Sequence, residues 1–181
     1  MHVGAKRVAL AGVLVAFTVA IMVLGSVIES STLFFIGAAS FCVGIAVREW
    51  GLRFGFGFLI AVVLVNIMVA PNKLYCITLA GMGFYIWMSE FLWEKIASTP
   101  RMKSRNVVLW IGKYVVFNAM YVPILFFMPK LIFTGRINGL AAVVFLFIGQ
   151  AVFFVYDRAY VYFQGYIWGK IRVKVMGKEY E

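Results

Sequence analysis

Charged and metal-binding side chains are scarce in this chain of 181 residues. Asp and Glu number 7 together, His 1 and Cys 2, and charged residues make up 13% of the sequence. Soluble domains carry about 25% charged residues, so this composition excludes a soluble globular protein as well as a highly charged disordered one. Two cysteines, Cys42 and Cys76, form no disulfide framework. A zinc centre needs three or four ligands, which argues against a site built around a single histidine.

Familiar catalytic motifs are also missing. The few acids form no DxxD-type metal–phosphate motif, and the sequence contains no Gly-rich phosphate loop, no HExxH and no nucleophile elbow. These absences do not exclude catalysis, but they favour a protein that is not an enzyme. We predict no cofactor.

Apolar residues dominate instead. Hydrophobic residues make up 64% of the chain, and the mean hydropathy is +0.97. A soluble core of this size cannot bury so much apolar surface, whereas lipid accepts it. At about 20 residues for each membrane-spanning helix, the chain has room for about six or seven spans. We therefore expect one membrane domain covering residues 1–181.

Six apolar runs divide the sequence. They predict an all-α, polytopic membrane protein with helices at about residues 8–28, 32–47, 54–70, 74–93, 107–128 and 138–156. The first run is longer than the 7–15 apolar residues of a signal peptide, so we interpret it as a retained helix. The second run is the shortest, at about 24 Å against a hydrocarbon core of about 30 Å.

The distribution of Lys and Arg predicts the orientation. With the N-terminus inside, the inner segments hold 13 basic residues and the outer segments hold 3. Cytoplasmic loops carry an excess of Lys and Arg, so both termini are predicted to be cytoplasmic. The 13 inner residues are Lys6, Arg7, Arg48, Arg53, Lys95, Arg101, Lys103, Arg105, Arg158, Lys170, Arg172, Lys174 and Lys178.

Residues 157–181 form a basic, aromatic tail after the last run. Its aromatics include Tyr160, Tyr162, Phe163, Tyr166 and Trp168, and its cations lie beside them. Aromatic rings favour the membrane interface, and cations favour anionic headgroups. An interfacial anchor or an extension of the sixth helix is therefore the first interpretation, and a helix that docks on a partner is the alternative.

Polar residues gather in the predicted outer half of the membrane domain. If they converge, they form an outward-facing pocket with aromatic walls and few polar anchors, as ligand pockets usually have. Scattered interfacial polarity is the competing interpretation. The candidate substrate-binding residues are Glu29, Asn66, Asn72, Lys73, Tyr75, Tyr85, Asn118, Tyr121, Arg136 and Asn138.

Two charges lie inside predicted spans near the cytoplasmic ends. Lys113 lies in the fifth run and Glu90 in the fourth, at depths of about 9 and 4.5 Å by helical rise. A Lys113–Glu90 pair, or snorkelling of the lysine, would satisfy these charges. An ion-coupling site at Lys113 is the alternative.

The first helix carries small residues at every fourth position, namely Gly12, Ala16 and Ala20. Such a stripe lets another helix approach closely, whether a helix of the same bundle or one of a partner. Together with the opening Lys-Arg-x-Ala-Leu-x-Gly-x-Leu-x-Ala and the six short helices, Ala16-Phe17-Thr18-Val19-Ala20 resembles the substrate-binding S components of energy-coupling-factor (ECF) transporters. Segments such as 71–75 and 155–158 also resemble S-component-like bacterial membrane proteins of no assigned activity.

The resemblance implies a function of capture without chemistry. S components bind vitamins or metal ions near the outer face, and their first-helix AxxxA stripe contacts a transmembrane T subunit. Two ABC ATPases complete the complex and drive the S component to topple in the membrane. By this resemblance, Gly12, Ala16 and Ala20 dock on the T subunit, and the chain carries a small nutrient inward.

Three other functions stay open. A membrane scaffold would bind protein partners through its basic loops and tail and would have a filled bundle. A small membrane enzyme would gather Glu49, Glu90, Glu94 and Asp157 at the inner face. A proton- or ion-coupled carrier would use Lys113 and would lose its main support if that lysine is dry and paired.

Overall fold

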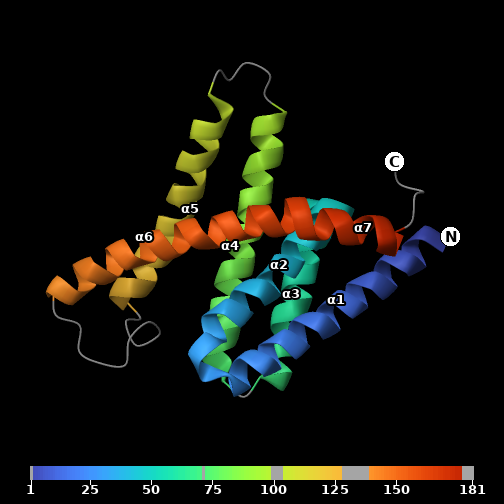
Figure 1. Cartoon of the computed structure of the whole chain (residues 1–181), viewed down its shortest axis with the longest axis horizontal. Coiled ribbons are helices and arrows are strands. Elements are labelled where there is room, and N and C mark those ends of the chain that lie inside the picture. The colour runs from blue at the N-terminus through green and yellow to red at the C-terminus, as the bar shows by residue number, and fades with distance from the viewer. Residues whose placement is uncertain (1, 71, 99–103, 128–138, 177–181) are drawn as a thin grey trace. The chain divides into compact units, whose positions relative to one another are not determined.

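The computed structural model describes residues 2–70, 72–98, 104–127 and 139–176, and only the backbone for 2–6, 29, 126–127, 139–142 and 173–176. These residues are 96% helical and contain no strand, which confirms the all-helical prediction. The elements, shown in Figure 1, are α1 (His2–Val27), η1 (Glu29–Ser31), α2 (Thr32–Trp50), α3 (Leu52–Val69), α4 (Lys73–Ala97), α5 (Arg105–Phe127), α6 (Gly139–Tyr162), the π-helix η3 (Phe163–Trp168) and α7 (Gly169–Met176).

The helices follow the predicted runs but extend past charged residues that were expected to end them. Helix α2 continues to Trp50 instead of residue 47, because Arg48 pairs with Glu90 inside the fold. The last helix does not end at residue 156, because Asp157 has a cationic partner in Lys113. The tail residues, for which an extension of the sixth helix was one interpretation, continue the helix through η3 and α7 to Met176.

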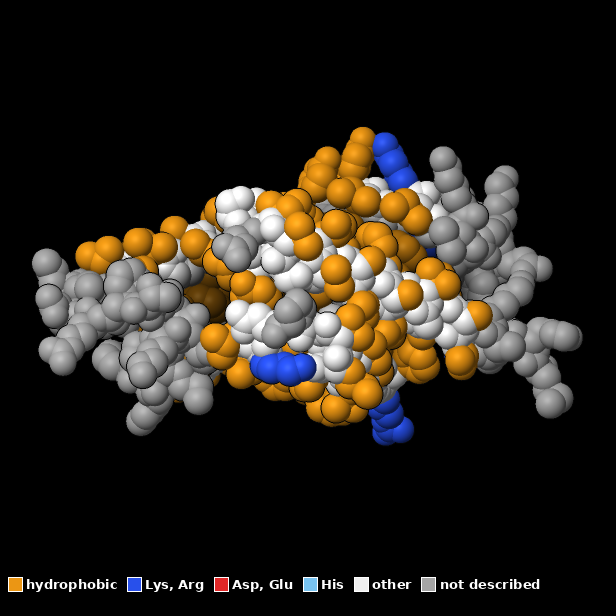
Figure 2. Space-filling view, turned by 90° about the horizontal axis from the view of Figure 1, so that it is seen from below, with side chains coloured by type: hydrophobic (Ala, Val, Ile, Leu, Met, Phe, Trp, Pro, Cys, Tyr) orange, Lys and Arg blue, Asp and Glu red, His pale blue; other side chains and the backbone are white. Residues whose placement is uncertain are grey.

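Among the described residues, five helical segments are long and apolar enough to cross a membrane; the sequence predicted six. Helix α4 is not among them, since it contains Glu90 and several Gly, Tyr and Trp residues of low hydropathy. Hydrophobic side chains are spread over the whole described surface in the view of Figure 2, with few charged ones among them. These features fit a multi-pass membrane protein. The five segments are Arg7–Val27, Thr32–Trp50, Leu52–Val69, Arg105–Leu125 and Val143–Arg172.

The chain divides into two compact units, residues 1–112 and 113–181. In the first unit, α2 packs against each of α1, α3 and α4 and forms the centre of the bundle. Apart from Phe41, its buried side chains are small or β-branched, for example Ala39, Val43 and Ala46, each fully buried. Side chains of this size allow the helices on every side of α2 to approach closely.

Gly51 makes the reversal between α2 and α3. It is the one described residue with a positive φ, at 88°, a conformation that a residue without Cβ adopts without strain. Its N–H donates to the carbonyl of Val47 at 2.8 Å and so satisfies one of the last backbone acceptors of α2. A single residue thus connects the two helices, whereas the sequence predicted a longer polar segment between residues 47 and 54.

In the second unit, α6, η3 and α7 form one long helix that is inclined to α5 (Figure 1). The buried face of this helix recurs at helical spacing, through Phe153, Asp157, Tyr160, Gln164 and Trp168. Phe153 stacks on Phe117 of α5 with ring centroids 4.3 Å apart. Two cysteines in the first unit, Cys42 and Cys76, are buried free thiols.

Candidate functional site

The small-residue stripe of α1 lies on the exposed side of the helix. Gly12, Ala16 and Ala20 are all exposed, and a Cβ added at Gly12 would meet no atom within 4 Å. The buried residues of α1, among them Leu14 and Thr18, lie on the opposite face. The stripe therefore faces away from α2 and α3, the helices of the first unit against which α1 packs.

Asn72 and Lys73 stabilise the connection between α3 and α4. The side-chain oxygen of Asn72 accepts the N–H of Leu74 at 3.0 Å and caps the start of α4. The ammonium of Lys73 donates to the backbone carbonyl of Ile67 and lies 3.5 Å from that of Ala70, at the C-terminus of α3. A cation there also interacts favourably with the helix dipole. Both predicted substrate-binding residues therefore have local structural roles.

Asn66, near the end of α3, is the most unusual polar residue of the first unit. It is 1% exposed, and its amide nitrogen donates to the carbonyl of Val62 at 2.8 Å. Its side-chain oxygen is buried and has no hydrogen-bond partner among the described residues. A buried acceptor without a donor costs free energy, and a donor group of a bound molecule would satisfy it.

Two further candidates lie on α4. Tyr75 is half-buried, one turn into the helix. Tyr85 is 3% exposed and belongs to the core. Ten residues separate them, about 15 Å along a helix, so the two rings do not share one level of the bundle.

Asn118 and Tyr121 lie in the second unit and hold α5 to α6. The amide of Gln150 donates to the side-chain oxygen of Asn118 at 2.7 Å, and Asn118 also donates to the carbonyl of Tyr114 at 2.8 Å. The hydroxyl of Tyr121 donates to the carbonyl of Phe145 at 2.7 Å. These two candidates thus have protein partners between helices.

The predicted pocket residues are divided between the two units. Five of them, Asn66, Asn72, Lys73, Tyr75 and Tyr85, belong to the first unit, and Asn118 and Tyr121 belong to the second. Arg136 and Asn138 lie outside the described residues, as does the side chain of Glu29.

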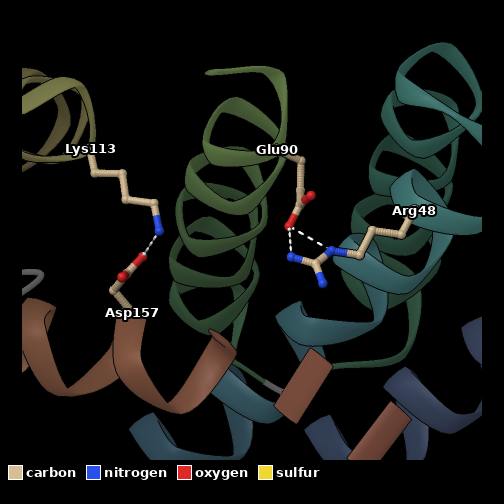
Figure 3. Close-up of polar contacts among 4 residues, drawn as sticks. All are labelled: Arg48, Glu90, Lys113 and Asp157. Atoms are coloured by element: carbon tan, nitrogen blue, oxygen red, sulfur yellow. Dashed lines mark hydrogen bonds and ion pairs between the residues drawn. The ribbon is translucent and has the colours of Figure 1, made fainter. Parts of the chain in front are cut away.

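Each of the two predicted intramembrane charges has a partner of opposite charge within its own unit. The guanidinium of Arg48 donates to one carboxylate oxygen of Glu90 through Nε at 2.9 Å and through a terminal nitrogen at 2.7 Å. The ammonium of Lys113 lies 2.7 Å from a carboxylate oxygen of Asp157. Figure 3 shows both pairs.

Gln150 was not among the candidate residues, and Asp157 was a candidate only for the enzyme alternative, although the sequence carries a signal for both as helix-contact residues. Gln150, Asp157 and Gln164 recur every seven residues, which places them on one face of a helix. Such a polar row in an apolar helix indicates a packed interface, because isolated polar side chains are unfavourable in lipid. The same paired Lys113 weakens the ion-coupled carrier as an alternative.

No group of three or more His, Cys, Asp or Glu side chains that could hold a metal ion occurs among the described residues. Comparison with protein-family models, with curated proteins and with solved structures finds no match. The contacts of the chain itself therefore carry the functional argument.

Proposed function

We propose that this chain is the substrate-binding subunit of an ECF-type importer in a bacterial cytoplasmic membrane. The observation that carries the proposal is the exposed stripe of Gly12, Ala16 and Ala20 on α1. In lipid no hydrophobic effect drives helices together, so close backbone approach across small residues is a main source of affinity. An exposed stripe of this kind favours a helical membrane partner, which by the resemblance is the T subunit.

The chain captures a small, vitamin-like nutrient and does no chemistry itself. ATP is hydrolysed in two partner ATPases, and the loaded subunit reorients to deliver its cargo inward. The unpartnered, buried oxygen of Asn66 supports a ligand site at the end of α3. The site would favour a ligand that donates a hydrogen bond to this oxygen, because an analogue without the donor would leave the buried acceptor unsatisfied.

Both termini lie in the cytoplasm in this proposal, with the α3–α4 connection at the outer face. The described cations of the first unit support this orientation. Arg48, Arg53 and Lys95 lie near the α2–α3 turn or the end of α4, whereas Lys73 alone lies near the α3–α4 connection. An excess of cations at one end marks the cytoplasmic side.

Affinity purification tests the docking surface. The tagged chain is purified from its host in mild detergent, and bound proteins and small molecules are identified by mass spectrometry. We expect a T subunit and two ATPases with the native chain. The double substitution Ala16→Leu and Ala20→Leu should remove them, because two added isobutyl groups keep the helices apart.

Ala61→Leu provides the matched control, since Ala61 is an exposed alanine on α3 of the same unit. This variant should retain the partners and the nutrient uptake of the native chain. Equal recovery of the partners with the α1 double variant would contradict docking through α1. Loss of the partners in all variants would point to a bundle that no longer folds, which circular dichroism of the purified chain detects.

A non-catalytic membrane scaffold is the second candidate, because one observation favours it. Asn118 and Tyr121, predicted to bind substrate, are hydrogen-bonded between α5 and α6. A filled α5–α6 contact is what a scaffold without cargo requires. Recovery of envelope-assembly proteins, with no ATPase and no co-purified metabolite, would favour the scaffold over the importer.

A further inference from the structure

Five residues at steps of four form one exposed row along α6, η3 and α7. We call this row the aromatic–cation face; it consists of Phe154, Arg158, Tyr162, Tyr166 and Lys170. The guanidinium carbon of Arg158 lies 5.6 Å from the ring centroid of Phe154. The rings of Tyr162 and Tyr166 stack at 5.3 Å. The ammonium of Lys170 lies 4.0 Å from the Tyr166 centroid and donates to the Tyr166 hydroxyl at 2.8 Å.

The π-helix η3 keeps this row on one side of the helix. In an α-helix, a step of four residues turns about 40° beyond a full turn, so a row at this spacing drifts around the axis. The turn of a π-helix holds more residues, and four of them fall short of a full turn. Residues Phe163–Trp168 adopt this wider turn within the row, so the drift is offset where Tyr162 and Tyr166 stack.

The exposed charges around the row are all positive. Between Val143 and Arg172 the exposed charged residues are Arg158, Lys170 and Arg172. The one acid of this range, Asp157, is 1% exposed and pairs with Lys113. The two tyrosines of the row are 60% and 51% exposed. The surface therefore combines cations with amphipathic rings and presents no exposed acid.

The length of the helix places the row, from Arg158 onward, at or beyond the edge of the hydrocarbon core. The helix from Gly139 to Met176 has 38 residues (24, 6 and 8) and is therefore about 57 Å long, against about 30 Å for the core. Its exposed large side chains are apolar from Val143 to Val155, and the first exposed cation is Arg158. Residues 139–157 alone span about 28 Å, so the core ends close to Arg158.

The extension follows the part of the helix that contacts α5. The hydrogen bonds and the ion pair with α5 involve residues from Phe145 to Asp157. In one continuous helix, Arg158 and the residues after it therefore lie at the end of the span, near one membrane surface. Tyrosine rings favour that depth, and cations there are attracted by anionic headgroups.

We propose that the aromatic–cation face binds the headgroups of anionic phospholipids. Arg158 and Lys170 pair with the phosphates, while Tyr162 and Tyr166 lie at the boundary between headgroups and acyl chains. This surface is independent of the proposed transport function and of the stripe on α1.

Lipid titration of the full-length chain tests the proposal. Phosphatidylglycerol or phosphatidylcholine is added to the chain in a neutral detergent, and bound lipid is counted by native mass spectrometry. The native chain should prefer phosphatidylglycerol. Arg158→Gln with Lys170→Gln should weaken its tightest binding about tenfold or more, since each cation contributes appreciably at an anionic surface. High salt should weaken the native binding in the same way.

Two matched variants make the outcome decisive. Arg53→Gln with Lys95→Gln removes two exposed cations elsewhere. This variant should change the lipid affinity less than about threefold, which is less than the loss expected from removing one cation of the aromatic–cation face. Arg158→Lys with Lys170→Arg keeps the charge and should bind as the native chain does. Equal losses from both neutral pairs, unchanged binding in the Arg158/Lys170 pair, or no preference for the anionic lipid would each overturn the proposal. Circular dichroism confirms that every variant is helical before it is compared.

Discussion

The ammonium of Lys113 on α5 and the carboxylate of Asp157 on α6 form a buried ion pair, 2.7 Å apart, with side chains 13% and 1% exposed. This pair explains why α6 continues where its apolar run ends. A lone carboxylate at this position would have to reach water, whereas a paired one allows the helix to continue through it. The extension that carries the aromatic–cation face thus depends on a residue of another helix.

Asp157→Asn should destabilise the protein strongly, by about 3–5 kcal/mol, because it leaves the Lys113 ammonium buried without a countercharge. Thermal unfolding of the purified chain in detergent measures the loss. The double substitution Lys113→Met with Asp157→Leu should cost much less than Asp157→Asn alone, since an apolar pair needs no countercharge. Single and double variants of equal stability would contradict a buried, mutually dependent pair.

The amides of Asn118 and Gln150 should be energetically coupled. Interhelical hydrogen bonds in membranes contribute about 0.6 kcal/mol on average and up to about 1.7. A double-mutant cycle with Asn118→Leu and Gln150→Leu should return a coupling energy in that range from thermal unfolding. As a control, Asn118→Leu combined with Gln164→Leu should be additive, because Gln164 lies 14 residues, about 21 Å, further along the helix. Coupling of equal size in both cycles would contradict a specific amide pair.

Sequence patterns determined most of the helices, because lipid imposes a simple rule that apolar runs of sufficient length become spans. The exceptions occur at Arg48 and Asp157, where hydropathy alone predicts an end and an ion pair removes the reason for it. The partner of a charge depends on the rotation and register of two helices, which a single sequence does not state. The spacing of Gln150 and Asp157 indicated that this face of the helix packs against another helix, but it did not identify α5 as that helix.

The candidate site was predicted only in part, for a related reason. Small residues on α1 are visible in the sequence, but whether they face the bundle or lipid depends on where Leu14 and Thr18 pack. The polar residues of the predicted pocket looked equivalent, yet Asn72 caps a helix while Asn66 has a buried, unsatisfied oxygen. Local hydrogen bonds separate these roles, and they require the three-dimensional arrangement.

The Arg48–Glu90 pair should respond asymmetrically to neutralisation, because its side chains are 39% and 8% exposed. Arg48→Gln leaves a nearly buried carboxylate without its guanidinium and should cost about 3 kcal/mol or more. Glu90→Gln leaves an arginine that can turn toward solvent and should cost about 1 kcal/mol or less. Thermal unfolding of both variants in one detergent measures the difference. Equal costs would contradict the unequal burial of the pair.

Gly149 on α6 should not tolerate a methyl group. A Cβ at this position would overlap the ring of Tyr121 and lie 2.6 Å from its hydroxyl. The ring cannot swing away easily, because that hydroxyl donates to the carbonyl of Phe145. Gly149→Ala should therefore destabilise the chain by about 1–3 kcal/mol, the usual cost of overpacking, measured by thermal unfolding.

Gly165 provides the matched control, since a Cβ there would meet no atom within 4 Å. Gly165→Ala should leave the stability unchanged or raise it by up to about 1 kcal/mol, through the higher helix propensity of alanine. In a Tyr121→Ala background the ring is absent, so Gly149→Ala should also lose its cost. A cost that persists without the Tyr121 ring would show that the helix backbone, and not the contact with α5, requires glycine at residue 149.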